Sequence, residues 1–275
     1  MWARIYGERS KYDAKHSLTG ATSNSTQWNL KTGFDGSLYE SADSAVIAGL
    51  NVQYGQIKSD IKSIYGNGNI DTTGYGFGAT LSWYGSNGVY LDGQANAIWF
   101  DSNLTSDRLG EITKGNKGFG YSFGLEIGKQ FALTPEWSVT PQVQLTYANV
   151  DFDRFQDRYD NPVHLDQGDQ LQGRFGVSLD HKRMWQAANG LYSRTHFYGI
   201  ANIYYDFLDR TDINLKNTIV FSENTPLWGG VGLGGNYSWD NDKYAIFGET
   251  MVETSLENFG DSYSFSGRLG FKVNW

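Results

Sequence analysis

The stretch that decides the fold is YSFSGRLGFKVNW, residues 263–275. One alternate set is apolar, aromatic or glycine: Tyr263, Phe265, Gly267, Leu269, Phe271, Val273 and Trp275. The set between them is polar, charged or glycine: Ser264, Ser266, Arg268, Gly270, Lys272 and Asn274. Side chains alternate between the two faces of a β-strand, so this pattern predicts a strand with one apolar face. A half-buried strand in a water-soluble protein alternates in the same way, so this stretch alone does not say what covers the apolar face.

The same two-residue period recurs along the chain, and the helical period is nearly absent. The sequence predicts an all-β protein whose strands are 2–12, 27–38, 46–54, 75–84, 91–99, 119–127, 137–147, 171–179, 197–207, 231–239, 244–252 and 263–275. Residues 213–221 also have an extended pattern, so thirteen or fourteen strands stay open. Bacterial single-chain barrels have even numbers of strands, which favours about twelve.

The links between the predicted strands alternate in length. Long polar links are expected at 13–24, 58–72, 102–117, 153–167 and 208–225, and short ones at 41–43, 85–88, 132–136 and 240–243. This alternation is typical of an up-and-down antiparallel barrel with short periplasmic turns and longer outer loops. Residues 182–193 break the pattern, because this link is longer than a turn where a short one is expected. The sequence offers no account of that exception.

Composition narrows the class of protein. The 275 residues include no cysteine, 34 glycines and 16% aromatic residues, and the net charge is −8. Disordered chains are poor in aromatic residues, so disorder is excluded. No run of about 18 apolar residues could form a spanning helix. The acidic balance also argues against nucleic acid as a partner.

Four features favour a membrane barrel over a water-soluble sandwich or lipocalin-like barrel, the alternative that stays open. The polar faces hold mostly glycine, serine, asparagine and glutamine, and the apolar faces hold almost no Lys or Arg. Strands of about 9–11 residues suit a tilted membrane span. Tryptophans gather near strand ends, as in the aromatic girdles of outer-membrane barrels. We expect this girdle to contain Trp28, Trp83, Trp99, Trp137 and Trp239.

In such a barrel the apolar face meets lipid and the polar face lines the lumen. The charged residues expected in the lumen are Arg4, Lys31, Asp35, Asp92, Glu126, Arg174, Asp206, Glu249, Glu253, Arg268 and Lys272. They can be compensating ion pairs that hold a wet interior together. They can also line a hydrophilic conduit, or form a docking surface for whatever occupies the pore. Because both signs are present, no strongly selective ion filter is indicated.

Motifs for catalysis and cofactors are lacking. The histidines His16, His164, His181 and His196 have no zinc-site spacing. The glycine-rich stretches 118–124 and 229–235 alternate as strands, with no following helix to bind a phosphate. The sequence therefore predicts no catalytic residue, no metal and no cofactor.

Four stretches resemble the C-terminal translocator domain of autotransporters (type V secretion). They are WARIYGE (2–8), FGYSFGLEIGKQFALTPEWSVTPQVQLTY (119–147), QGRFGVSL (172–179) and SFSGRLGFKVNW (264–275). The resemblance extends over the whole chain and is strongest to the self-associating adhesins, typified by the adhesin involved in diffuse adherence. It implies a twelve-stranded barrel in the outer membrane of a Gram-negative bacterium, which anchors an N-terminal passenger and assists its export. The implied partners are that passenger, the barrel-assembly machinery, and outer-membrane lipid and lipopolysaccharide.

In this family the assembly machinery recognises the last strand, which ends in an aromatic residue. The matching positions are Tyr263, Phe265, Leu269, Phe271, Val273 and Trp275. Phenylalanine is the usual last residue, so Trp275 departs from the pattern while keeping an aromatic ring, and we expect assembly to tolerate it.

The resemblance also implies the domain organisation. We expect one barrel domain over residues 1–275, with the family's pore helix and the passenger absent, because the chain begins in its first strand. Some members cleave themselves with lumenal acids, and Glu126, Glu249 and Glu253 occupy comparable positions. Without the helix there is no substrate for such cleavage, so no enzyme activity is expected. The alternatives are an outer-membrane enzyme (a protease or lipase) and a small porin. The enzyme would need a histidine beside Ser, Asp or Asn at one rim, and none of the four histidines is expected there.

Overall fold

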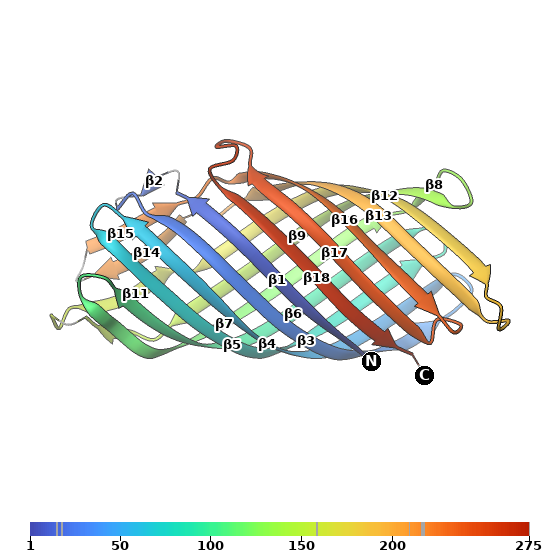
Figure 1. The fold of residues 1–275 in the computed structure, drawn as a ribbon, viewed down its shortest axis with the longest axis horizontal. Coiled ribbons are helices and arrows are strands. Elements are labelled where there is room, and N and C mark those ends of the chain that lie inside the picture. Colours follow the sequence, from blue (N-terminus) through green and yellow to red (C-terminus); the bar gives the residue numbers. More distant parts are fainter. Residues whose placement is uncertain (15, 18, 158, 209, 216–217, 275) are drawn as a thin grey trace.

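The computed structural model describes the chain except residues 15, 18, 158, 209, 216–217 and 275. Its main sheet is an antiparallel barrel closed by pairing of the first and last strands, from Trp2 with Lys272 to Lys11 with Tyr263 (Figure 1). The barrel strands are β1 (Trp2–Asp13), β3 (Thr22–Glu40), β4 (Ser44–Ser63), β5 (Gly66–Gly85), β6 (Val89–Ser106), β7 (Gly110–Lys129), β9 (Trp137–Phe152), β12 (Asp169–Gln186), β13 (Tyr192–Asp206), β16 (Leu227–Trp239), β17 (Tyr244–Ser255) and β18 (Tyr263–Val273). The prediction of an up-and-down barrel of twelve strands is confirmed.

The rest of the β-structure lies at the ends of the barrel. Strand β8 (Phe131–Ala132) only extends the hairpin that leads into β9. A separate five-stranded sheet has the order β10-β11-β14-β15-β2, and its strands are β2 (His16–Ser17), β10 (Phe155–Gln156), β11 (Pro162–Gln167), β14 (Arg210–Leu215) and β15 (Thr218–Glu223). Residues 213–215 and 218–221 of the extended stretch 213–221 therefore belong to two strands of this sheet, and residues 216–217 lie outside the described residues. Among the described residues, no helix has the length and apolar character needed to cross a membrane.

The two ends of the barrel differ. The "turn end" carries the short links 41–43, 86–88, 133–136, 187–191 and 240–243 together with both chain ends, and the "loop end" carries the five-stranded sheet (Figure 1). The predicted alternation of links is only partly right. Links 58–72 and 102–117 shrink to the turns 64–65 and 107–109, because β4 to β7 are 18 to 20 residues long. Beyond the lipid the outward positions of these strands become polar, as at Lys58, Asp60 and Asp71, so the apolar outer face that marks a strand is lost while the backbone pairing continues.

The exceptional link at 182–193 has the same explanation. Strand β12 continues to Gln186 and β13 begins at Tyr192, with Trp185 paired to Ser193. The connection is therefore the turn 187–191, closed by a bond from the Ala187 amide to the Leu191 carbonyl at 2.8 Å. Two strands that extend past the turn-end rim replace the long loop that the sequence suggested.

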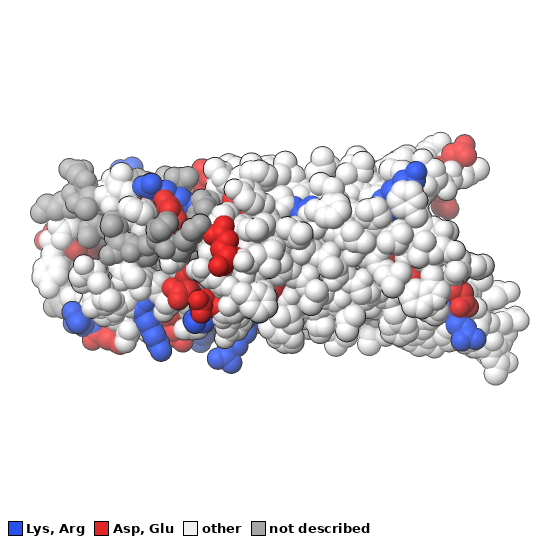
Figure 2. All heavy atoms as spheres, turned by 90° about the horizontal axis from the view of Figure 1, so that it is seen from above, with Lys and Arg blue, Asp and Glu red and all other residues white. Residues whose placement is uncertain are grey.

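Burial in this molecule is the reverse of a water-soluble protein. In the described part of the chain the buried hydrophobic residues are Trp228 and Ala245 alone, whereas buried serine, threonine, asparagine and glutamine side chains are numerous. Large apolar side chains point outward, with 69% exposure at Leu50 and 70% at Leu233. Figure 2 shows a broad middle belt on one face in which charged side chains are rare. Such a surface is stable in contact with lipid and would be unstable in water, which removes the water-soluble alternative.

The tryptophans expected in the girdle fall at two levels. Trp28 and Trp99 lie toward the loop end, with Trp99 between the rings of Tyr75 and Phe119 at 6.0 and 5.4 Å. The other three tryptophans lie near the links of the turn end; they are Trp83, Trp137 and Trp239. The Trp239 ring lies 5.7 Å from Tyr244. Amphipathic rings at two levels are the arrangement expected where a barrel meets both membrane interfaces.

Glycines on the inner wall make room for aromatic rings. The ring of Tyr198 packs against Gly234, where an added Cβ would overlap it. The Tyr198 hydroxyl donates a hydrogen bond to Glu249 in the lumen.

We expect Gly234→Ala to displace the Tyr198 ring and lower the free energy of unfolding by about 1–3 kcal/mol. Denaturant titration in lipid vesicles measures the change. Gly36→Ala is the control, because nothing lies within 4 Å of its added Cβ. Equal free energies of unfolding for the two variants would contradict the close contact of the Tyr198 ring with Gly234.

Candidate functional site

The candidate site is the lumen, which holds a cavity of about 690 Å³. Of the charged residues expected there, five line this cavity, namely Glu126, Arg174, Glu249, Glu253 and Arg268. Arg4 and Lys31 line a second cavity of about 350 Å³ against β1 and β3. Asp35, Asp92, Asp206 and Lys272 share the inward strand positions and contact other inward residues. The strand alternation that sends Leu and Phe outward sends these residues inward.

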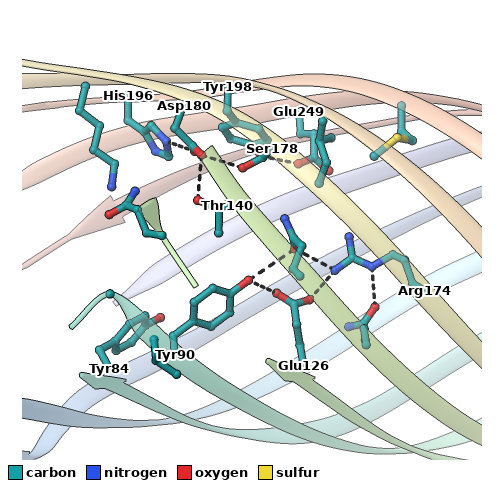
Figure 3. A pocket seen from close by; sticks show the side chains of 18 of the residues that line it. Tyr84, Tyr90, Glu126, Thr140, Arg174, Ser178, Asp180, His196, Tyr198 and Glu249 are labelled. Carbon is teal, nitrogen blue, oxygen red and sulfur yellow. Dashed lines mark hydrogen bonds and ion pairs between the residues drawn. The ribbon is translucent and has the colours of Figure 1, made fainter. Parts of the chain in front are cut away.

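The central cluster joins five strands, β6, β7, β9, β12 and β13, around Arg174 (Figure 3). Its Nη2 lies 2.5 Å from Glu126 Oε2 and donates to Gln142 Oε1 at 3.0 Å. Two further bonds reach Gln144 from Nε at 3.1 Å and Asn202 from Nη1 at 3.0 Å. The other Glu126 oxygen accepts a bond from the Tyr90 hydroxyl at 2.6 Å. Only 13% of the Arg174 side chain and 17% of the Glu126 side chain are exposed. A charge pair with this many bonds fixes the positions of the strands that carry it.

A second cluster lies toward the turn end and was missed by the sequence prediction (Figure 3). His196 Nε2 lies 2.8 Å from Asp180 Oδ1. The other oxygen, Asp180 Oδ2, accepts bonds from Ser178 at 2.7 Å and Thr140 at 3.1 Å. The expectation that no histidine stands beside Ser and Asp is therefore wrong. It failed because Asp180 and His196 lie just outside the predicted strands 171–179 and 197–207, and become neighbours only through the β12–β13 pairing.

This cluster lacks the geometry of a nucleophilic triad. In a triad the imidazole accepts the proton of the hydroxyl and the acid orients the imidazole. Here the Ser178 hydroxyl donates to the Asp180 carboxylate, which His196 also contacts. The carboxylate joins the two groups, and the hydroxyl is not bonded to the histidine. The arrangement suits a hydrogen-bonded brace between β9, β12 and β13.

The remaining charged residues form smaller contacts. Glu249 and Arg268 are cross-strand partners, with Arg268 Nη2 3.0 Å from Glu249 Oε2. Near the turn end, Asp35 accepts from Trp2 Nε1 at 2.9 Å and lies 3.6 Å from Lys272 Nζ. Three further residues of the set contact uncharged partners: Ser82 donates to Asp92, Gln172 donates to Asp206 at 2.9 Å, and Lys31 donates to Asn96 at 3.2 Å. Six of the eleven charged residues thus form three ion pairs on the wall.

The positions expected to mark the last strand lie on the outer face of β18. Tyr263, Phe265, Leu269 and Phe271 are 42 to 55% exposed there. Val273 is half-buried, and its amide bonds to the Met1 carbonyl at 2.8 Å. Trp275 lies outside the described residues.

The family, sequence and structure comparisons with known proteins each match autotransporters. The family model "Autotransporter beta-domain" matches residues 1–250. The chain is 41% identical over its whole length to the adhesin BmaC autotransporter of Brucella suis, of which it spans 8%. It superposes over 100% of its length on 90% of the transport unit of the autotransporter AIDA-I from Escherichia coli, with a TM-score of 0.80 and 17% identity. The translocator domain of NalP from Neisseria meningitidis, covered to 88%, gives a TM-score of 0.63 at 13% identity.

Proposed function

Because the chain belongs to the autotransporter β-domain family, we propose that it anchors an N-terminal passenger in the outer membrane and assists its export to the cell surface. The observation that carries this proposal is a closed barrel with an apolar outer face and a polar lumen. Such a wall offers hydrogen bonds to a polypeptide backbone that leaves the periplasm. The chain is an outer-membrane protein of the Gram-negative type, as its family and fold require.

We propose that the passenger is an adhesin. The support is the name of the Brucella suis relative, an adhesin autotransporter that matches the whole chain at 41% identity. The chain spans only 8% of that relative, so the remaining length there is available for other domains.

The test is surface display of a reporter. A periplasmic export signal and a small reporter domain are fused in front of the chain and expressed in a Gram-negative host. We expect protease added to intact cells to remove the reporter and leave a heat-modifiable barrel in the outer membrane. A folded barrel whose reporter stays protected in the periplasm would contradict the proposal.

We also propose that the outer face of β18 is recognised by the barrel-assembly machinery. We expect the pair Phe265→Ser and Phe271→Ser to lower the amount of folded barrel in cells about tenfold or more, because recognition loses two aromatic anchors. Heat-modifiable migration of outer-membrane fractions measures this. The purified variant should still fold into lipid vesicles, and Ser264→Ala on the inner face is the control. Unchanged assembly in cells would refute recognition by this face.

No enzyme activity forms part of this proposal. Of the three positions comparable to the cleavage acids of some family members, Glu126 and Glu249 are each held by an arginine, and Glu253 lines the lumenal cavity. The hydroxyl of Ser178 is committed to Asp180. Outer-membrane lipid and lipopolysaccharide are the proposed surroundings of the apolar belt between the aromatic levels.

A further inference from the structure

Two lumenal cations differ from the others. Arg174, Arg268 and Lys272 lie 2.5, 3.0 and 3.6 Å from carboxylate oxygens. For Arg4 and Lys31, by contrast, the described part of the chain provides no ion pair with an acid. They are direct cross-strand partners on β1 and β3 and both are half-buried. Like charges directly opposite one another destabilise a sheet, so the wall holds two adjacent cations here that lack a direct ion pair among the described residues.

The neighbouring positions add an unused amide donor and no charged acceptor. Across the strands this row of the wall runs Gly270, Arg4, Lys31, Gln53, Gly76. The Nε2 atom of Gln53 is buried and has no hydrogen-bond partner. Arginine and lysine carry donors only. The glycines contribute no side chain, and the Phe247 ring lies over Gly270. The row therefore presents three adjacent groups of N–H donors.

The surroundings leave these donors mostly unused. Lys31 Nζ donates one bond, to the uncharged amide oxygen of Asn96 at 3.2 Å. The Arg4 guanidinium lies over the Trp2 ring, 5.5 Å from its centroid. Glu249 is the carboxylate that lines the same 350 Å³ cavity. It already accepts bonds from Tyr198 and Arg268. An anion in this cavity would meet donors from three strands and one engaged acid.

We propose that Arg4, Lys31 and Gln53 form a carboxylate-binding site on the lumen wall, which holds an aspartate or glutamate side chain of a polypeptide lying in the pore. The identity of the occupant rests on the proposed export function, because export brings polypeptide into the lumen. A carboxylate has two oxygens that accept charge-assisted bonds, and the guanidinium, ammonium and amide groups supply the matching donors. Acetate and phosphate offer the same chemistry, so the experiment must separate free anions from peptide side chains.

The test is single-channel recording of the purified barrel in planar bilayers. A glutamate-rich peptide and a lysine-rich peptide of equal length are added in turn to the turn-end side. We expect the glutamate peptide to block the current for longer. In the double variant Arg4→Gln, Lys31→Gln its block should shorten about tenfold or more, because each charged contact contributes strongly to binding. The control is Lys272→Gln, a lumenal cation that already has Asp35 as partner, and its block should change less than about twofold.

Equal block times in the wild type and the double variant would overturn the site. A wild-type barrel that is stabilised by acetate or phosphate but blocked equally by both peptides would overturn the polypeptide occupant. Folding of the double variant is checked independently, since removing the like-charge pair should leave its unfolding midpoint equal or higher. The single-channel recording is made on the barrel without a passenger, so its result does not depend on export. A barrel that shows the charge-dependent block but fails to display a reporter in cells would therefore contradict the export function and support the site.

Discussion

Arg174→Ala will lower the free energy of unfolding of the barrel by about 3 kcal/mol, at the lower end of the cost of breaking a buried charge pair because the lumen admits water. Arg174 donates to Glu126, Gln142, Gln144 and Asn202. Its loss leaves the Glu126 carboxylate, 17% exposed, with the Tyr90 hydroxyl as its remaining described partner. Denaturant titration in lipid vesicles gives the value. Membrane insertion should persist, because Arg174 faces inward.

Two controls test whether the lost stability comes from the ion pair between Arg174 and Glu126. Adding Glu126→Gln to Arg174→Ala removes the uncompensated charge, so the double variant should recover part of the lost stability. Lys272→Ala, which breaks a more exposed pair with Asp35, should cost no more than about 1 kcal/mol. If Arg174→Ala abolished insertion while keeping stability in vesicles, the inward placement of this side chain would be wrong.

Leu125→Arg will cost about 2–4 kcal/mol, the penalty for a charged residue on the lipid face at mid-depth. Leu125 is 55% exposed on β7, between the outward residues Phe123 and Ile127, and pairs with Leu145 on β9. It lies between Phe119 near one aromatic level and Phe131 near the other. An arginine there must leave the hydrocarbon or thin the bilayer around it. Vesicle unfolding measures the penalty.

The matched control is Gln94→Arg on the adjacent strand β6. Gln94 is an inward residue that is open to the lumen and pairs with Gly124, the neighbour of Leu125. The same charge should then meet water and cost less than about 1 kcal/mol. Equal penalties for the two variants would mean that both faces contact the same medium, contrary to an inverted barrel.

The sequence predicts the barrel well where lipid imposes alternation, and poorly where it does not. The strand at 75–84 is marked by outward Tyr75, Phe77 and Leu81, because hydrocarbon tolerates only one kind of residue there. In residues 58–63 and 66–73 the outward positions are polar, so the apolar outer face that reveals a strand in the sequence is missing although the backbone pairing continues. That loss of signal also hid the hairpin around 187–191 and the pairing of β14 with β15 in the small sheet.

The sequence predicts which side chains point into the lumen, but it does not predict which of them contact one another. The alternation of apolar and polar side chains along each strand is enough to predict that Glu126 and Arg174 point inward. Their contact, however, spans 48 positions and depends on which residues the β7–β9–β12 register aligns. Asp180 and His196 escaped notice because they lie one residue beyond the predicted strand ends. The donor row at Arg4, Lys31 and Gln53 likewise appears only when three strands are placed side by side.

The most direct test of the central claim uses the absence of cysteine in the chain. Thr146→Cys places a thiol on the inner face of β9, and Leu145→Cys places one on the outer face, where the leucine is 50% exposed. Each variant is folded into lipid vesicles and treated with a water-soluble maleimide. The account predicts that the inner thiol reacts at least about tenfold faster, because thiolate forms in water and not in hydrocarbon. Equal rates, or faster reaction of the outer thiol, would contradict a lipid-facing apolar surface around a water-filled lumen.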